Sequence, residues 1–193
     1  MSKPATVSDI MRVMRELGRT PFLPEGAQPY ADVDLPLPIG HGQTNSQPST
    51  VVAMLELLEV GAGMRVLDVG AGSGWTTAIL ARLVGPAGRV LGVERIADLT
   101  RRATTTLAGL DLPWAEIRQA VPGVLGLPDE GPYDRILVSA EASEIPGDLV
   151  EQLAPGGIMV IPVRSVMHRV CRSPTGTVED SRHGLYSFVP LIR

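Results

Sequence analysis

The sequence predicts an α/β fold: a mostly parallel sheet with helices on both faces and an antiparallel edge. From residue 65 onward, short apolar runs alternate with longer amphipathic runs, which is the pattern of βα units. The first of these apolar runs, residues 66–69, passes directly into glycines spaced Gly-x-Gly-x-Gly. Near its end the chain has two apolar runs with no helix between them, and such neighbouring strands pair antiparallel.

The amino-terminal part is predicted as a helix, a long loop and a second helix. Residues 7–17 carry apolar side chains at helical spacing, with Ser8 as the expected cap. Six prolines and three glycines between residues 20 and 48 argue against regular structure there. The region is still too apolar to be disordered, and a long ordered loop in a compact domain usually carries function. A helix is then expected over residues 49–60, with Pro48 at its start.

The remaining elements follow from the alternation of apolar runs. Strands are expected near residues 65–69, 89–93, 115–119, 134–138 and 158–162. Helices are expected near residues 75–84, 96–108 and 147–153. Two closing strands, at residues 167–172 and 185–191, are joined through the polar segment 173–176 and form the antiparallel edge.

Size and composition indicate one globular domain. The chain has 193 residues, of which 44% are hydrophobic and 20% charged, with a net charge of −4. No Lys/Arg cluster supports nucleic-acid binding, and neither a membrane span nor a signal peptide is recognisable. The single Cys171 and three scattered histidines offer no metal site. We therefore expect a cytoplasmic monomer.

The turn after the first predicted strand is the most informative feature. A strand, a glycine turn and a helix bring the backbone close to a bound nucleotide, and glycine is needed where side chains would block the ligand. Glu94 ends the second predicted strand, roughly twenty residues further on, where a carboxylate accepts hydrogen bonds from ribose hydroxyls. Together these features predict a cofactor that contains a nucleoside.

Glycine spacing distinguishes between candidate cofactors. Dinucleotide sites prefer Gly-x-Gly-x-x-Gly, with the pyrophosphate on the helix N-terminus. Here the third glycine, Gly74, comes one residue early, and Asp68 stands just ahead of Gly70. An acid at that place repels a diphosphate but suits the ammonium of a methionine moiety. The pattern favours S-adenosylmethionine (SAM) over NAD; the alternative is a tight turn that binds nothing.

A second candidate site lies in residues 39–48, which are rich in hydroxyl and amide groups and lead into a helix N-terminus. Such a terminus attracts anions through free N–H groups and its partial positive charge. Ser46 or Thr44 would hydrogen-bond a carboxylate there. Alternatively, Ser46 or Ser49 would merely cap the helix. Spacing alone leaves both interpretations open.

With these motifs the chain resembles the protein-L-isoaspartate O-methyltransferases. The likeness is carried by LPIGHGQTNSQP at residues 37–48 and VLDVGAGSG at residues 66–74. Shorter matches follow in the family's order at residues 93–95, 132–136, 145–146, 152–153, 156–157 and 188–191. The resemblance implies a seven-stranded, Rossmann-like SAM-methyltransferase fold. It also implies methyl transfer to the α-carboxylate of isoaspartyl residues in damaged proteins, which begins their repair.

The resemblance also implies a layout and a set of site residues. Residues 1–48 would form the first helix and the substrate loop, residues 49–162 the cofactor-binding core, and residues 163–193 the closing strands. Ser46 matches the family's active-site serine, with Thr44 as its neighbour. Positions around the cofactor are matched by Gln43, Thr44, Asn45, Ser46, Asp68, Gly70, Gly72, Glu94, Arg95, Pro122 and Gly123.

Three residues depart from the family pattern. Pro122 stands where the family carries an acid near the adenine amine, so its backbone carbonyl or Gln119 would have to substitute. Asn45 replaces an apolar residue, and Glu141 follows the fourth strand, facing either the reacting carboxylate or solvent. The alternatives are therefore a different peptide or small-molecule carboxylate as acceptor, or a SAM-binding protein with weak or no catalysis. An NAD-dependent oxidoreductase is opposed by the glycine spacing and by Asp68.

Overall fold

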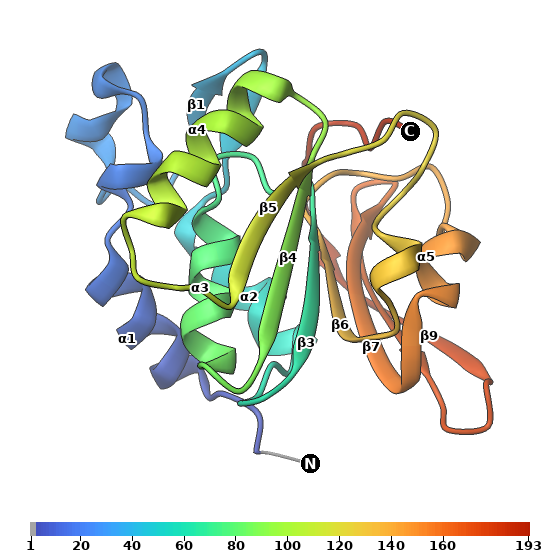
Figure 1. Cartoon of the computed structure of the whole chain (residues 1–193). Coiled ribbons are helices and arrows are strands. Elements are labelled where there is room, and N and C mark those ends of the chain that lie inside the picture. Colours follow the sequence, from blue (N-terminus) through green and yellow to red (C-terminus); the bar gives the residue numbers. More distant parts are fainter. Residues whose placement is uncertain (1–2) are drawn as a thin grey trace.

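A seven-stranded sheet runs through the molecule in the strand order β5-β4-β3-β6-β7-β8-β9 (Figure 1). The computed structural model describes residues 3–193; Met1 and Ser2, which the expected segment 1–48 includes, lie outside the described residues. The first five strands in that order are parallel, and β8 and β9 continue them antiparallel. The predicted class, the parallel core and the antiparallel edge are confirmed.

Most elements lie within a few residues of their predicted positions. The sheet consists of β3 (Arg65–Val69), β4 (Arg89–Glu94), β5 (Ala115–Gln119), β6 (Tyr133–Val138), β7 (Leu153–Val163), β8 (Val166–Arg172) and β9 (Val178–Leu185). The α-helices are α1 (Val7–Leu17), α2 (Pro48–Leu58), α3 (Trp75–Val84), α4 (Ala97–Ala108) and α5 (Gly147–Glu151). Short 3-10 helices are η1 (Thr20–Phe22), η2 (Glu25–Tyr30) and η3 (Pro128–Glu130), and a separate hairpin consists of β1 (Leu37–Gly40) and β2 (Gln43–Asn45).

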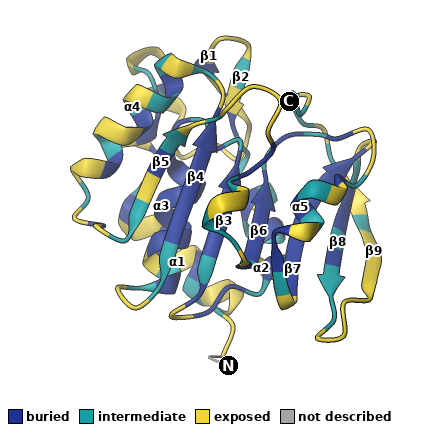
Figure 2. Ribbon diagram, turned by 45° about the vertical axis from the view of Figure 1, so that its right-hand side comes forward, coloured by how far each residue is buried: buried dark blue, intermediate teal, exposed yellow. Residues whose placement is uncertain are grey.

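Alternating side chains of the strands divide the core into two layers. Val66 of β3 packs in a cluster with α1, α2, α3 and part of α4, whereas Leu67 and Val69 pack in a second cluster with α5. Helices therefore cover both faces, the four longer ones on one side and α5 on the other (Figure 1). Figure 2 shows the buried central strands and the exposed β9 at the sheet edge. No helix within residues 3–193 is long and apolar enough to cross a membrane.

The cap of α1 differs from the prediction. Thr6 Oγ1 accepts a hydrogen bond from Asp9 N at 3.2 Å, and Asp9 Oδ2 accepts one from Thr6 N at 3.0 Å. This reciprocal capping box requires a side-chain acceptor three residues after the cap. Thr6 has Asp9 there, whereas Ser8 has Met11, so Ser8 lies inside the first turn.

Residues 20–48 are more regular than their proline content suggests. Two 3-10 helices and the β1–β2 hairpin occupy most of this region. Pro21 lies in the first turn of η1, where the missing N–H leaves no helical bond unmade. The pairing of β1 with β2 shifts register between Pro38 and Gly40, so the hairpin forms with an irregularity in β1. The expectation of an irregular loop was therefore wrong.

The prediction of a last strand at residues 185–191 was also wrong. The final strand is the polar β9, and residues 186–191 cross over the strand ends instead of joining the sheet. There, Glu141 N donates to Val189 O and Leu191 N donates to Glu141 O, both at 2.7 Å. The apolar side chains that suggested a strand include Tyr186, Phe188 and Leu191, which are partly buried against the two core clusters. By contrast, β9 is an exposed edge and lacks an apolar pattern.

Candidate active site

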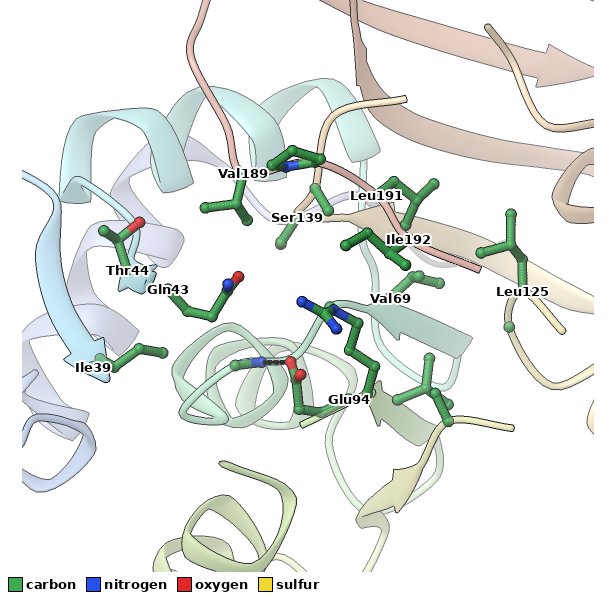
Figure 3. Close-up of a pocket in the computed structure, with 18 of the residues that line it drawn as sticks. Ile39, Gln43, Thr44, Val69, Glu94, Leu125, Ser139, Val189, Leu191 and Ile192 are labelled. Carbon is green, nitrogen blue, oxygen red and sulfur yellow. Dashed lines mark hydrogen bonds between the residues drawn. The ribbon is translucent and has the colours of Figure 1, made fainter. Parts of the chain in front are cut away.

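A cleft lies at the carboxyl ends of β3, β4 and β6, the edge where parallel sheets bind ligands. It is open to solvent and offers about 650 Å³ of space between the glycine turn after β3, the end of β4, the loops after β5 and β6, and the carboxyl-terminal segment. Figure 3 shows Gln43 and Glu94 extending toward this space, with Val189, Leu191 and Ile192 along one wall. The wall is apolar, and the polar groups are few and concentrated.

The glycine turn is fastened to β4 by its backbone. Gly70 N and Ala71 N both donate to Val93 O, at 2.9 and 3.0 Å, and Gly72 N donates to Glu94 Oε2 at 2.9 Å. Gly70 and Gly72 have φ of 79° and 56°, a region that glycine enters without strain. Because these three amides are engaged within the protein, they do not offer the cradle of free N–H groups that a pyrophosphate needs.

Glu94 is held rigidly at the mouth of the cleft. The residue is only 6% exposed, and its two side-chain oxygens accept hydrogen bonds from Gly72 N and from Ile96 N, the latter at 2.8 Å. A carboxylate has about four acceptor sites, so each oxygen keeps one for a ligand. Two hydroxyls on adjacent carbons, as in a ribose, match such a pair of acceptors.

The predicted adenine side of the site is arranged differently from the expectation. Arg95 lines the cleft, but Gln119 does not; Gln119 Nε2 donates to Arg95 O at 2.7 Å and so supports its backbone. Pro122 is exposed and outside the cleft lining, and Gly123 lines a neighbouring pocket. The chain therefore turns outward at these two positions.

Residues just beyond Gly123 form the cleft wall instead, and sequence reasoning missed them. Leu125 and Gly126 line the cleft, and the buried Gln152 holds both in place. Gln152 Nε2 donates to Leu125 O at 2.8 Å, and its Oε1 accepts from Leu127 N at 3.0 Å. Gln152 is more than twenty residues from Leu125 and Leu127 in the sequence, so no local sequence pattern indicates these contacts.

Asp68 lies beneath the turn, not in the cleft lining. Its side chain is fully buried, and Oδ2 accepts hydrogen bonds from Thr76 Oγ1 and Thr77 Oγ1 at 2.8 and 2.7 Å. Within the described part of the chain, Oδ1 has no partner. Burial raises the pKa of Asp68 to about 6, against the opposing effect of the two threonine hydrogen bonds. A buried carboxylate with an unsatisfied oxygen favours a cationic ligand group nearby.

A second groove adjoins the cleft on the side of the β1–β2 hairpin. It is open to solvent, with about 1440 Å³ of space, and its lining includes the hydroxyl residues Thr44, Ser46 and Ser139. Thr44 and Ser139 line both spaces, so the groove opens directly onto the cleft. Ser139 comes directly after β6, at the strand end where ligands bind, and this position is the signal that could have identified it.

The two interpretations of Ser46 can now be separated. Neither Ser46 nor Ser49 caps α2, which has Gln47 at its N-cap and no side-chain cap from that residue. Asp34 supplies the acceptor instead: its Oδ1 accepts from Ser49 N at 2.8 Å, and its Oδ2 accepts from Gln47 Nε2 at 3.0 Å. The capping interpretation was wrong, and the Ser46 hydroxyl is available to the groove.

The other two departures from the family pattern point away from the reacting space. Asn45 is 4% exposed, and its amide contacts Arg19 and Ser73. Glu141 Oε2 accepts from Ser165 N at 3.0 Å, and Glu141 lines neither the cleft nor the groove. Glu141 therefore does not oppose a carboxylate in the groove.

These features fit SAM better than a dinucleotide. Glu94 suits a ribose, the apolar wall suits a base, and the unsatisfied Asp68 suits a cation close by. The engaged amides of the turn oppose a diphosphate. Among residues 3–193 no group of three or more His, Cys, Asp or Glu side chains is arranged to hold a metal ion.

We predict that Asp68→Asn removes a pH dependence of stability. Because the pKa rises from 3.8 to about 6, the folded protein retains this proton longer than the unfolded chain. The contribution of Asp68 to the free energy of unfolding therefore falls as pH rises from about 4 to 6, by about 3 kcal/mol, and is constant outside that window. Urea unfolding across pH 4–8 should show this fall in the difference between the ligand-free wild type and Asp68→Asn, because the other titrating groups are common to both. Parallel pH profiles would contradict the assignment.

Known proteins provide an independent comparison. The family model described as protein-L-isoaspartate(D-aspartate) O-methyltransferase matches residues 3–193. A protein-L-isoaspartate O-methyltransferase of Methanopyrus kandleri is 44% identical over 187 residues, covering 95% of this chain and 83% of that protein. A protein-L-isoaspartate O-methyltransferase of Aeropyrum pernix is 45% identical over 188 residues, covering 94% of this chain and 72% of that protein.

A solved structure agrees with the fold. It is a Plasmodium falciparum crystal structure described as a protein-L-isoaspartate O-methyltransferase in complex with S-adenosyl-L-homocysteine. It superimposes with a TM-score of 0.83 at 28% identity, covering 95% of this chain and 89% of that one. The chain therefore belongs to the protein-L-isoaspartate(D-aspartate) O-methyltransferase family, whose members depend on SAM.

Proposed function

We propose that this chain transfers the methyl group of SAM to the α-carboxylate of L-isoaspartyl residues in damaged proteins and peptides. The observation that carries the proposal is the hydroxyl-lined groove, which opens onto the cofactor cleft through Thr44 and Ser139. A carboxylate can enter from the groove while the cofactor occupies the cleft. Family membership supports the choice of an isoaspartyl acceptor.

The chemistry makes modest demands on the protein. A carboxylate with a pKa near about 4 is ionised at neutral pH, so the reaction needs no general base. SAM supplies the methyl group together with a sulfonium leaving group. What the side chains must provide is alignment of the attacking oxygen and exclusion of water. Hydroxyl donors such as Ser46 and Thr44 would hold one carboxylate oxygen and leave the other free to react.

The cofactor would be held by two acids in different ways. We assign Glu94 to the ribose, because both of its oxygens are fixed by backbone amides at the cleft mouth. We assign Asp68 to an indirect electrostatic role beneath the turn, because it is buried and does not line the cleft. Gln43, Gly70, Gly72 and Arg95 complete the set through their places in the lining.

The product and the assembly follow from the same proposal. The methyl ester would lose methanol to form a succinimide, which partly reopens to normal aspartate and so repairs the chain. We also propose that the protein acts as a monomer. In support, the exposed edge strand β9 carries Glu179, Asp180 and Arg182, and charged side chains on an edge discourage pairing with a second copy.

The direct test is incubation with an isoaspartyl peptide and methyl-labelled SAM. We expect a base-labile methyl ester on that peptide and none on the same peptide with normal aspartate. Intact SAM binding by calorimetry, with no ester formed, would favour a different carboxylate acceptor or a SAM-binding protein without catalysis. No measurable SAM affinity would contradict the enzyme assignment.

We predict that Ser46→Ala reduces methyl transfer far more than SAM binding. The loss of one donor to the acceptor carboxylate should cost about 1.5–3 kcal/mol, or roughly 10- to 150-fold in kcat/KM for the peptide. Steady-state kinetics and calorimetry would measure the two effects separately. Ser49→Ala is the matched control, because Ser49 lines the same groove and its backbone bond to Asp34 is retained. Equal loss of transfer and SAM affinity in Ser46→Ala would show that Ser46 serves the cofactor.

We predict that Glu94→Gln weakens SAM binding by about 1–3 kcal/mol. An ionised acceptor binds hydroxyls more strongly than an amide does, and the amide nitrogen can no longer accept from Gly72 N or Ile96 N. Calorimetry with SAM gives this difference directly. Glu116→Gln on the neighbouring strand is the control, since that side chain is exposed and lies outside the cleft. Unchanged affinity in Glu94→Gln would remove Glu94 from the ribose.

A further inference from the structure

Arg19 is a buried cation that forms no ion pair among the described residues. Its side chain lies just after α1, and the residue is 5% exposed. Its guanidinium donates only to neutral acceptors. These are Asn45 Oδ1 at 2.7 Å, Ser46 O at 2.8 Å, Leu35 O at 2.9 Å, Asn45 O at 3.0 Å and Val33 O at 3.1 Å.

An unpaired buried charge is costly to keep in a fold. Burial lowers the pKa of Arg19, and the nearby carboxylate of Asp34 opposes that shift. An arginine nevertheless remains charged at neutral pH. Its face also lies 5.3 Å from the ring centroid of Trp75, which opens α3. The side chain therefore provides a fixed positive charge that no carboxylate of the described chain neutralises by contact.

This charge lies directly beneath the substrate loop. Arg19 Nη2 binds the carbonyl oxygens of both Asn45 and Ser46, and so fixes the backbone that carries the Ser46 hydroxyl. Asn45 extends the connection, because its Nδ2 donates to Ser73 Oγ at 3.0 Å. Ser73 belongs to the glycine turn, so one buried chain of hydrogen bonds links the acceptor loop to the cofactor turn.

The groove itself contains no charge. Its lining has no Lys, Arg, His, Asp or Glu side chain among the described residues. Among the described residues, two charged side chains outside the lining bond to residues of its wall: Arg19 through Ser46 O, and the exposed Asp34 through Gln47 and Ser49. An entering carboxylate would be attracted by the first and repelled by the second.

We propose that Arg19 is the positioning residue of the acceptor site: it fixes Ser46 and selects an anionic acceptor, while Asp34 moderates that attraction. The inference rests on the proposed function, because it takes the groove as the place where the acceptor carboxylate binds. Beyond that function, the proposal identifies Arg19, which lies outside the groove lining, as the group that makes the acceptor site selective for an anion.

Asp34→Asn tests the charge argument with the least disturbance to the fold. Asparagine keeps one oxygen that accepts the bond from Ser49 N, so the backbone amide at the start of α2 stays satisfied while the negative charge is removed. The bond from Gln47 Nε2 to the second oxygen is lost, and both groups lie at the exposed surface. We expect the KM for an isoaspartyl peptide, at saturating SAM, to fall about threefold, with kcat and SAM affinity unchanged. Asp32→Asn is the control: Asp32 is also exposed, lies two residues away and does not line the groove, so its KM should stay at the wild-type value. An unchanged or higher KM in Asp34→Asn, or an equal fall in Asp32→Asn, would overturn the proposal.

Arg19→Met and Arg19→Lys separate charge from positioning. We expect Arg19→Met to raise the peptide KM at least about tenfold and to lower kcat as well. Lysine restores the charge but not the forked set of donors, so its KM should recover to within about threefold of wild type while kcat stays low. Equal KM values in the two variants would show that the charge plays no part. If neither variant folds, as judged by circular dichroism, the KM measured for Asp34→Asn alone decides whether the proposal stands.

The two levels of proposal fail in different ways. If the wild type forms no methyl ester on the isoaspartyl peptide, the proposed function fails before any variant is compared. If the wild type forms the ester but the Asp34 and Arg19 variants follow none of these KM patterns, only the role of Arg19 fails.

Discussion

The attachment of the glycine turn to β4 is the constraint on which the site depends. Three consecutive amides of the turn, from Gly70 to Gly72, donate to Val93 O and to the Glu94 carboxylate. One set of bonds thereby shapes the turn, orients Glu94 and engages three N–H groups that could otherwise bind a phosphate. Asp68, just ahead of the turn, is fully buried, and its Oδ1 has no hydrogen-bond partner among residues 3–193. Preference for a cationic, ribose-bearing cofactor follows from this geometry.

The acceptor side uses a different principle. Its groove is lined by neutral groups, and the charge that attracts an anion lies beneath the floor at Arg19. Placing the cation there keeps it from forming a tight ion pair that would hold the substrate in its ground state, which would not speed the reaction. The chain of bonds from Arg19 through Asn45 to Ser73 also sets the acceptor loop against the cofactor turn, and alignment is the main demand of this reaction.

Much of the cofactor half could be predicted from the sequence because its signals are local. The strand at residues 65–69 and the helix at residues 75–84 are in the predicted positions, since buried parallel strands are apolar runs and the glycines mark the turn. The missed features depend on tertiary contacts. The polar β9 has no apolar pattern, Gln152 supports the cleft wall across many residues, and Arg19 acts on backbone carbonyls, which any sequence provides.

A crystal structure with bound S-adenosylhomocysteine tests the central claim most directly. The account predicts the ribose hydroxyls within hydrogen-bond distance of Glu94, the base against Leu125, and the bonds from Gly70, Ala71 and Gly72 to β4 unbroken. The sulfur should face the hydroxyls of Thr44 and Ser139. A ligand bound away from Glu94, or a turn that releases its amides from β4 to hold the ligand, would contradict the account.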